Sequence, residues 1–436
     1  MFHVKHIWSK FISFKLHEVL FYLFLITMPL QTRIILNPSE AYISWYFNYH
    51  LAIIFYLSDL MLVSCFISWF VIEKPKFKVD RIIWLILAFF VLTFTTWFHV
   101  KHLNLSILGV FKWIELLLLI LYVRETFRET IQFYSAGTIL FVSALIQSIL
   151  ALWQFHVQHM VGFTWLGEYI APLGVSGLAT IDTVAGKVIR AYGTFPHPNV
   201  LAGFLIFGLL MGFYIVSRET KYRSLVAGGT ILITLGIFVT FSRLAWLGAG
   251  IAYVCFVIYW LWQKQWQKGL ILAIIGLVSC GTIWFGYNNY LKTRVLDTNP
   301  TSITDRGFFN NLGSQIITQH PLFGIGAGNY VPALQKQSTL QPWQYQPPHN
   351  IFIFLAAELG IGALAIFILL IAQILQMAST APRSAIKFAL ILLGLIFIAL
   401  GQFDHYFVTI QQGRLMLFVL LGLLAALPNL NYEKSN

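Results

Sequence analysis

One polar segment, QPPHN at residues 346–350, is followed at once by the apolar run IFIFLAAELGIGAL at residues 351–364. A histidine and an asparagine therefore stand where a water-exposed segment enters a long apolar helix. Arg190 and Arg243 occupy similar edges, the first in RAYGTFPHPNVLAG and the second between two apolar runs. Charged and ionisable side chains are costly in a bilayer, so their repeated placement at the ends of apolar runs indicates a function.

The composition indicates a polytopic α-helical membrane protein. The chain of 436 residues is 58% hydrophobic and only 10% charged, whereas soluble domains are about 25% charged. Many apolar runs reach the roughly 20 residues that cross a bilayer as a helix. Their continuous Leu, Ile and Phe content differs from the short alternating segments of a membrane barrel. Much of the net charge of +12 lies in short loops, so it reflects membrane topology, and we expect no nucleic acid partner.

The chain is predicted to form a single polytopic membrane domain, residues 1–436, with about twelve transmembrane helices. Two connections are long, 153–197 and 287–349, and the others are short. The predicted spans are residues 18–36, 51–72, 82–98, 105–121, 132–152, 198–217, 224–241, 243–262, 268–286, 350–374, 384–401 and 412–427.

The lysines and arginines predict the orientation of the chain. If the N-terminus lies in the cytoplasm, most of the 28 lysines and arginines fall in the inner segments, as the positive-inside rule requires. Both termini are then cytoplasmic, and the two long loops are extracytoplasmic. Arg190, Arg243 and His349 are predicted to lie on the outer side together.

The longer of the two loops is predicted to carry a short amphipathic helix. The stretch FFNNLGSQIITQHP, residues 308–321, has apolar residues at roughly helical spacing, and we expect it to lie on or near the membrane surface. Pro321 and the glycines of GIGAGNY, residues 324–330, are predicted to end it.

The outward ends of several predicted spans favour binding of an anion. A helix N-terminus carries free N–H groups and partial positive charge. Arg190 lies shortly before one outward N-terminus, Arg243 opens another, and His349 and Asn350 open a third. The planar guanidinium group of arginine pairs with phosphate oxygens in bidentate fashion. An outward-facing, lipid-accessible diphosphate suits this arrangement.

Each of these residues also has a structural explanation. Arg243 can mark a span boundary or contact lipid headgroups, although an arginine in a short outer hairpin runs against the positive-inside rule. Arg190 lies in a long loop, where solvated arginines are common. His349 alone can be an interfacial side chain, and Arg414 is typical of a headgroup anchor. The histidines have no spacing that requires a metal, and we expect no metal and no cofactor.

Three acidic residues fall inside predicted spans. Asp59 and Glu115 lie within two of them, and Glu358 lies about two turns into a third. Acids inside a membrane are candidates for function, but hydrogen bonding to a neighbouring helix explains them equally well.

These landmarks together resemble the O-antigen ligase/polymerase superfamily, whose members are bacterial membrane glycosyltransferases that act on polyprenyl-diphosphate-linked glycans. The resemblance covers about the C-terminal half of the chain, and it is carried by the ordered set rather than by any single piece. The matching pieces are RAYGTFPHPNVLAGFL (190–205), TFSRLAWLGAG (240–250), TDRGFFNNLGSQIITQHPLFGIGAGNY (304–330) and PPHNIFIFLAAELGIGAL (347–364).

The resemblance implies roles for individual residues. Arg190 and Arg243 match arginines that hold the lipid-linked diphosphate, and His349 matches a histidine that activates or orients the acceptor hydroxyl. The additional candidates are Asn350, Arg306 and Arg414. The resemblance also implies glycosyl transfer without a metal. A sugar on a diphosphate carries a good leaving group, so arginines that stabilise the departing charge and a histidine that takes a proton would be sufficient.

The sequence therefore predicts a glycan ligase of the cytoplasmic (inner) membrane. Its partners would be a polyprenyl-diphosphate-linked glycan donor, a glycan or glycolipid acceptor and membrane lipids, and transfer would occur at the outer face. The motifs of polymerases and protein O-glycosyltransferases of the same superfamily overlap with those of ligases, so a repeat-unit polymerase is an alternative. A transporter, from a different class, predicts inverted repeats and broken mid-membrane spans, and we find no repeat in the sequence.

Overall fold

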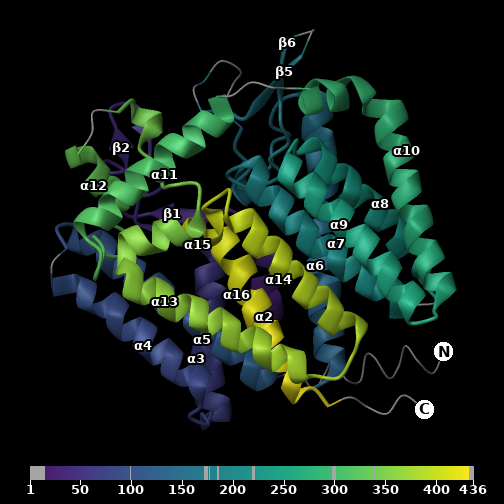
Figure 1. The fold of residues 1–436 in the computed structure, drawn as a ribbon, viewed down its shortest axis with the longest axis horizontal. Helices are drawn as coiled ribbons and strands as arrows, with labels where there is room; N and C mark the ends of the chain where they lie inside the picture. Colours follow the sequence, from purple (N-terminus) through teal and green to yellow (C-terminus); the bar gives the residue numbers. More distant parts are fainter. Residues whose placement is uncertain are drawn as a thin grey trace.

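The computed structural model of the protein describes residues 15–98, 100–170, 175, 177–183, 186–218, 221–296, 301–337 and 340–431. Most of this described part is helical (Figure 1), which confirms the all-α integral membrane fold. The chain ends that we predict to be cytoplasmic lie outside the described residues. The helices are α2 (Leu16–Thr27), α3 (Leu57–Glu73), α4 (Arg81–Thr95), α5 (Leu103–Thr126), α6 (Thr130–Val157), α7 (Pro198–Arg218), α8 (Arg223–Val239), α9 (Arg243–Trp262), α10 (Trp266–Leu296), α11 (Thr301–Gln319), α12 (Tyr330–Gln337), α13 (Ile351–Thr380), α14 (Ala385–Gly401), α15 (Tyr406–Thr409) and α16 (Gln411–Ala426).

Short strands and 3₁₀ turns occur between these helices. Three antiparallel pairs form, with Arg33 opposite Tyr56, Tyr42 opposite Phe47, and Thr180 opposite Ile189. The strands are β1 (Arg33–Ile35), β2 (Tyr42–Ile43), β3 (Tyr46–Phe47), β4 (Ile54–Tyr56), β5 (Thr180–Thr183) and β6 (Gly186–Ile189), and the 3₁₀ turns are η1 (Thr96–Phe98), η2 (Thr164–Leu166), η3 (Pro342–Gln344) and η4 (Leu427–Asn429).

Within the described residues, 8 helical segments are long and apolar enough to cross a membrane. They contain α4 with η1, α5, α6, α7, α9, α10, α13, and α16 with η4. Shorter apolar helices, α2, α8 and α14, lie in three further predicted spans. The remaining predicted span, 51–72, contains α3. Each of the twelve predicted segments therefore holds a helix, and their number as membrane crossings stays a prediction.

The first predicted span is longer than the helix that it contains. The sequence predicts a helix through residues 18–36, but α2 ends at Thr27, and Arg33–Ile35 pairs with Ile54–Tyr56 as a small sheet. Pro29 follows the helix after one residue and cannot donate the next backbone hydrogen bond. The apolar run therefore divides between a helix and a strand.

The loop predicted at residues 287–349 begins later than expected and holds more than one helix. The backbone of α10 departs from helical geometry at Tyr287, with φ of −134° and ψ of 18°, close to the predicted end of the span. The helix then continues to Leu296. The helix predicted within residues 308–321 is present as α11, which packs against α13, and a second helix, α12, follows it. Figure 1 shows α11, α12, β2 and the β5–β6 hairpin in the upper part of the view.

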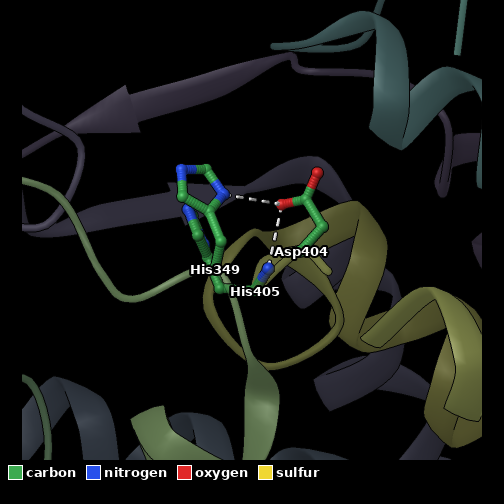
Figure 2. A group of neighbouring side chains, drawn as sticks. All are labelled: His349, Asp404 and His405. Carbon is green, nitrogen blue, oxygen red and sulfur yellow. Dashed lines mark hydrogen bonds and ion pairs between the residues drawn. The ribbon is translucent and has the colours of Figure 1, made fainter. Parts of the chain in front are cut away.

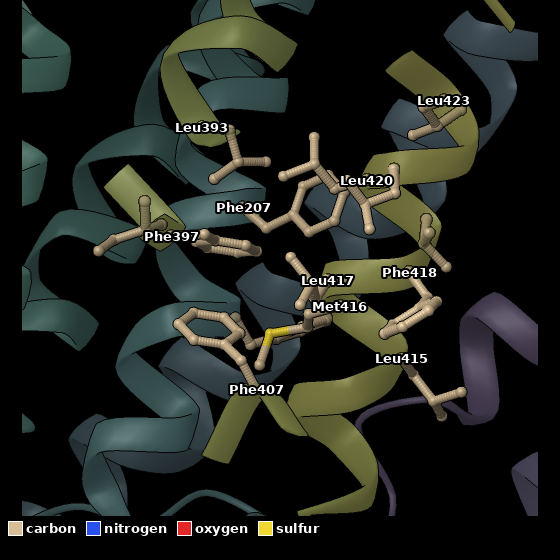
Figure 3. Close-up of a cluster of buried hydrophobic side chains, with 14 of the residues drawn as sticks. Phe207, Leu393, Phe397, Phe407, Leu415, Met416, Leu417, Phe418, Leu420 and Leu423 are labelled. Atoms are coloured by element: carbon tan, nitrogen blue, oxygen red, sulfur yellow. The ribbon is translucent and has the colours of Figure 1, made fainter. Parts of the chain in front are cut away.

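Two helices, α7 and α16, form the centre of the bundle. All the residues of α7 from Val200 to Ser217 are buried, as are those of α16 from Leu415 to Ala426. Figure 3 shows Phe207 of α7 facing Phe397 of α14 and Leu420 of α16 in one apolar cluster. A helix that is apolar on every face belongs in the interior of a bundle, which leaves the ends of these helices to carry polar groups.

Glu358 of α13 forms hydrogen bonds with the glycine-rich loop at residues 324–330. Its carboxylate accepts a hydrogen bond from the backbone N–H of Gly328 at 2.9 Å, and its carbonyl accepts one from Gly326 at 2.8 Å. The helix is interrupted at Gly360, whose φ is +85°. A Cβ there would collide with the carbonyl oxygen of Leu322. Glu358 and Gly360 of the quoted stretch 347–364 thus have an architectural role, and Glu358 does not line the cavity described below.

The acids Asp59 and Glu115 lie in a buried ionic cluster. Both carboxylates pair with Lys112, which connects α3 with α5. Gln411 of α16 donates a hydrogen bond to Asp59. The side chains of Asp59 and Glu115 are only 3% and 2% exposed. A structural role is therefore sufficient to explain these two acids.

Candidate functional site

A cavity of about 970 Å³ opens among the loop segments and helix ends. This volume is at the upper end of the range typical of ligand pockets, roughly 300–1,000 Å³. Arg190, Arg243, Arg306 and His349, which the sequence analysis selected, all line it. Residues separated by as many as 159 positions in the chain therefore face one space.

Arg190 is held at the N-terminal end of α7. Its Nε donates to the carbonyl oxygen of Thr240 at 2.7 Å, and a terminal nitrogen donates to Oδ1 of Asn199 at 2.7 Å. The residue is 8% exposed. Burial, together with the nearby charges of Arg294 and Arg306, lowers the pKa of Arg190 to about 9, so the guanidinium stays charged at neutral pH.

Asp404 connects Arg190 with His349. Its Oδ2 accepts a hydrogen bond from the Asn199 amide at 2.8 Å, and its Oδ1 accepts one from the backbone N–H of His405 at 2.9 Å. The same Oδ1 lies 3.9 Å from Nδ1 of His349, which is an ion-pair distance rather than a hydrogen bond. Figure 2 shows His349 and His405 beside the Asp404 carboxylate. Nδ1 of His349 is buried and has no hydrogen-bond partner among the described residues.

Burial disfavours the charged form of the other histidines of the cavity. Burial lowers the pKa of His50 and His197 to about 3, and that of His405 to about 4. Burial alone would raise the pKa of Asp404, but the interactions with His349, His405 and His197 outweigh it and hold that pKa below its ordinary value. Asp404 is therefore ionised at neutral pH.

The cavity has an excess of positive charge. Its lining contains the arginines 190, 243, 294 and 306 but only the acids Asp305 and Asp404. Arg243 is the first residue of α9, so it stands at the positive end of a helix dipole. Arg294 donates from Nε to the carbonyl oxygen of Phe241 at 3.2 Å, which places it beside the same hairpin. This distribution of charge favours an anionic ligand.

Two of the additional candidates have structural roles instead of facing the cavity. Asn350 is the N-cap of α13, and its Oδ1 accepts hydrogen bonds from the backbone N–H groups of Phe352 and Ile353 at 2.9 and 3.2 Å. Arg414 donates from Nε to the carbonyl oxygen of Val408 at 2.8 Å. Both are absent from the cavity lining in the described structure. Asn350 fixes the start of α13 directly after His349.

Sequence reasoning missed Asp404, Asn199 and Arg294. Asp404 gave no signal of its own, because the positive-inside rule concerns lysine and arginine, and an acid in an outer connection is ordinary. Asn199 stood within the quoted motif RAYGTFPHPNVLAG, but its contact with an acid 205 positions away exists only in the folded chain. Arg294 falls within the predicted loop 287–349, because hydropathy does not predict the extension of α10 to Leu296.

One group in the cavity has the composition of a metal site. Ligand atoms of His349, Asp404 and His405 lie within 4.8 Å of one another. Several of these ligand atoms already make hydrogen bonds within the protein, however. Both oxygens of Asp404 accept hydrogen bonds, and Nδ1 of His405 is 2.6 Å from the Thr409 hydroxyl. The arginines around the cavity also disfavour a cation. The expectation of a site without a metal stays a prediction.

Part of the chain, including several cavity residues, matches a known protein family. Residues 228–368 match the family model of the O-antigen ligase. Over these residues the match confirms the resemblance to the O-antigen ligase/polymerase superfamily, and the long apolar helices are those of an integral membrane protein. The match covers about a third of the chain, including Arg243, Arg306 and His349, whereas Arg190 and Asp404 lie outside it.

The other comparisons add no functional information. No curated protein matches the chain. A chain from a solved structure of a peptidoglycan synthase complex aligns at 14% identity, over 79% of this chain and 96% of that one. Its TM-score is 0.35, and a likeness at that level carries no argument about this protein.

Proposed function

We propose that the protein is a glycan ligase that transfers a polyprenyl-diphosphate-linked glycan onto an acceptor at the outer face of the cytoplasmic membrane. The observation that carries this proposal is the arrangement of four arginines with His349 and Asp404 around one cavity. The arginines suit a diphosphate, and the histidine suits an acceptor hydroxyl. The family match supports the same class of reaction.

In the proposed reaction, the acceptor oxygen attacks the anomeric carbon of the donor sugar. The bond from that carbon to the diphosphate oxygen breaks, and polyprenyl diphosphate leaves with the electron pair. Arg190 and Arg243 stabilise the negative charge that develops on the leaving group. The proton of the acceptor hydroxyl passes to His349. No metal is needed, because the guanidinium groups supply the positive charge.

Asp404 complements His349 in this reaction. A hydrogen on Nδ1 that points towards Asp404 leaves the lone pair of Nε2 for the acceptor hydroxyl. After proton transfer, the imidazolium lies 3.9 Å from an ionised carboxylate, which stabilises it. Asp404 also accepts a hydrogen bond from Asn199, and Asn199 accepts one from Arg190. One set of contacts therefore positions both His349, the proposed base, and Arg190, which is proposed to bind the diphosphate.

The proposal is tested by reconstituting the purified protein with lipid-linked glycan and an acceptor extract from the producing cells. We expect glycan to appear on the acceptor with release of polyprenyl diphosphate, and EDTA to leave the rate unchanged. Lipid-linked products that grow by whole repeat units would identify a polymerase instead. Glycan that crosses the vesicle membrane without any transfer would identify a transporter.

The orientation of the chain gives a separate prediction. In a variant without the three native cysteines, Ser314→Cys and Asp182→Cys should react with an impermeant maleimide on spheroplasts, since both loops are expected to face outward. Both positions are exposed in the structure. Gln265→Cys, exposed in the connection between α9 and α10, should react only after lysis. The reverse pattern would contradict the topology and, with it, the outward-facing site.

Arg243 gives the prediction most specific to the donor. Arg243→Ala should weaken binding of undecaprenyl diphosphate about tenfold or more, because a hydrogen bond to a charged group contributes roughly 1.5–3 kcal/mol. Arg243→Lys should recover only part of this loss, since lysine keeps the charge without the bidentate geometry. Equilibrium binding in nanodiscs measures the effect.

Arg223→Ala provides a matched control for Arg243, because Arg223 also opens a helix but does not line the cavity. Its donor affinity should equal that of the wild type. Full affinity in Arg243→Ala would leave membrane topology as the better explanation of this arginine.

A further inference from the structure

One side of the cavity is formed by aromatic residues that the proposed mechanism does not use. They come from two segments far apart in the chain, the β2–β3 hairpin with the residues after it, and the η3 turn. The aromatic wall consists of Tyr46, Phe47, Tyr49, Trp343 and Tyr345, all of which line the cavity. The hairpin lies outside the part of the chain that matches the family model, whereas Trp343 and Tyr345 lie inside it.

The two segments of the aromatic wall are fixed to each other. The side chain of Asn48, which is 4% exposed, donates to the carbonyl oxygen of Tyr345 at 2.7 Å. Trp45, at the tip of the hairpin, lies with its ring 6.1 Å from that of Trp343. The Tyr345 hydroxyl accepts the backbone N–H of Leu340 at 3.1 Å, which closes the chain around η3. The wall is therefore ordered before any ligand binds.

The aromatic wall is adjacent to the proposed reaction centre. Tyr345 precedes His349 by four residues, and Pro347 and Pro348 restrict the backbone between them. The ring of Phe309 in α11 also lies 5.8 Å from the His349 ring. A molecule that presents a hydroxyl to His349 would thus extend along these aromatic faces.

The next residue of α11, Asn310, has an unused hydrogen-bond acceptor. Its side-chain oxygen is buried and has no hydrogen-bond partner among the described residues, although the residue lines the cavity. A buried carbonyl oxygen without a partner costs free energy unless a ligand or a water molecule satisfies it. A hydroxyl group is a suitable donor. Asn310 also follows Arg306 by four residues, so it lies on the same face of α11 as one of the cavity arginines.

A sugar ring matches these two features together. Its C–H groups form a flat apolar face that packs on aromatic rings, and its hydroxyls donate to side-chain oxygens. Aromatic residues at a membrane interface can also contact lipid, but a lipid chain has no donor for Asn310. We propose that the aromatic wall and Asn310 form a subsite for a pyranose ring of the glycan substrate. This inference rests on the proposed function and adds the place where sugar is recognised.

The subsite is tested with Trp343→Ala and Asn310→Leu in nanodiscs. Three quantities are measured: affinity for sugar-free undecaprenyl diphosphate, affinity for lipid-linked glycan extracted from the producing cells, and the acceptor concentration at half-maximal transfer. Both variants should bind the sugar-free lipid as the wild type does. Each should lose about tenfold in one of the other two quantities, roughly the size of a lost ring contact for Trp343→Ala and of a lost hydrogen bond for Asn310→Leu.

The measurements distinguish the source of the sugar. A loss in affinity for lipid-linked glycan places the donor sugar in the subsite, whereas a raised acceptor requirement places the acceptor sugar there. Trp343→Phe should restore most of the lost affinity because it keeps an aromatic face. Trp165→Ala is the control, since Trp165 is 70% exposed and lies outside the cavity lining.

Two outcomes would overturn the inference. One is a pair of folded variants, Trp343→Ala and Asn310→Leu, that match the wild type in all three quantities. The other is an equal loss of affinity for the sugar-free lipid, which would assign the wall to the lipid chain. Failure of the proposed function gives a different result from both. The wild type would then bind lipid-linked glycan through Trp343 but would not bind sugar-free undecaprenyl diphosphate. That result would keep the sugar subsite and would remove the proposed binding of the diphosphate by the arginines.

Discussion

His349→Ala is expected to reduce the turnover of glycan transfer by about a hundredfold or more, the range that general-base catalysis usually contributes. The imidazole is 21% exposed, lines the cavity and lies beside an ionised carboxylate. Asn350 caps α13 through its own side chain, so removal of the histidine ring leaves the start of the helix intact. Affinity for undecaprenyl diphosphate should therefore stay close to that of the wild type, and the loss should appear in turnover.

His349→Gln separates catalysis from orientation. Glutamine can hydrogen-bond to an acceptor hydroxyl but cannot take its proton, so this variant should be nearly as impaired as His349→Ala. His320→Ala is a matched control, because His320 is an exposed histidine after α11 that does not line the cavity. A folded His349→Gln protein with near-normal turnover would limit His349 to orienting the acceptor. Normal turnover in His349→Ala would end its catalytic assignment.

The parts of the fold that follow from local sequence could be predicted. Long apolar runs can only be satisfied in a bilayer as helices, and each predicted span contains one. The predicted helix bounds are wrong where one apolar run contains two different secondary-structure elements. Residues 33–35 form a strand instead of the end of a helix, because pairing with residues 54–56 satisfies their backbone. Hydropathy does not contain that long-range information.

The candidate site could be predicted only where a residue was unusual for its position. Arg190, Arg243 and His349 stood at span ends and do line one cavity. Asn350 had the same position, but its side chain is used by the backbone of α13. Position in the sequence does not distinguish a helix cap from a ligand contact, since both occur at the same helix end. The aromatic wall was hidden for a related reason, because aromatic residues are common at every membrane interface.

The second large effect is expected for Asp404→Asn, with a loss in turnover of about a hundredfold. The wild-type carboxylate accepts hydrogen bonds at both oxygens, from the Asn199 amide and the His405 backbone. An asparagine has only one acceptor oxygen, so its NH₂ group would face a donor. Asn199 cannot turn its amide to compensate, because its oxygen accepts a hydrogen bond from Arg190 at 2.7 Å. The substitution also removes the negative charge 3.9 Å from His349.

A double-mutant cycle determines whether Asp404 acts through His349 or merely supports the fold. If its role is to position the imidazole and stabilise the imidazolium, Asp404→Asn should cost much less turnover in the His349→Ala background than in the wild type, because coupled groups are non-additive. Transfer rates of the four proteins at saturating donor give this coupling directly. Thermal unfolding of the same proteins shows whether each remains folded. Equal losses in both backgrounds would mean that Asp404 acts independently of His349, through Asn199 and Arg190, and would remove it from the proposed proton-transfer step.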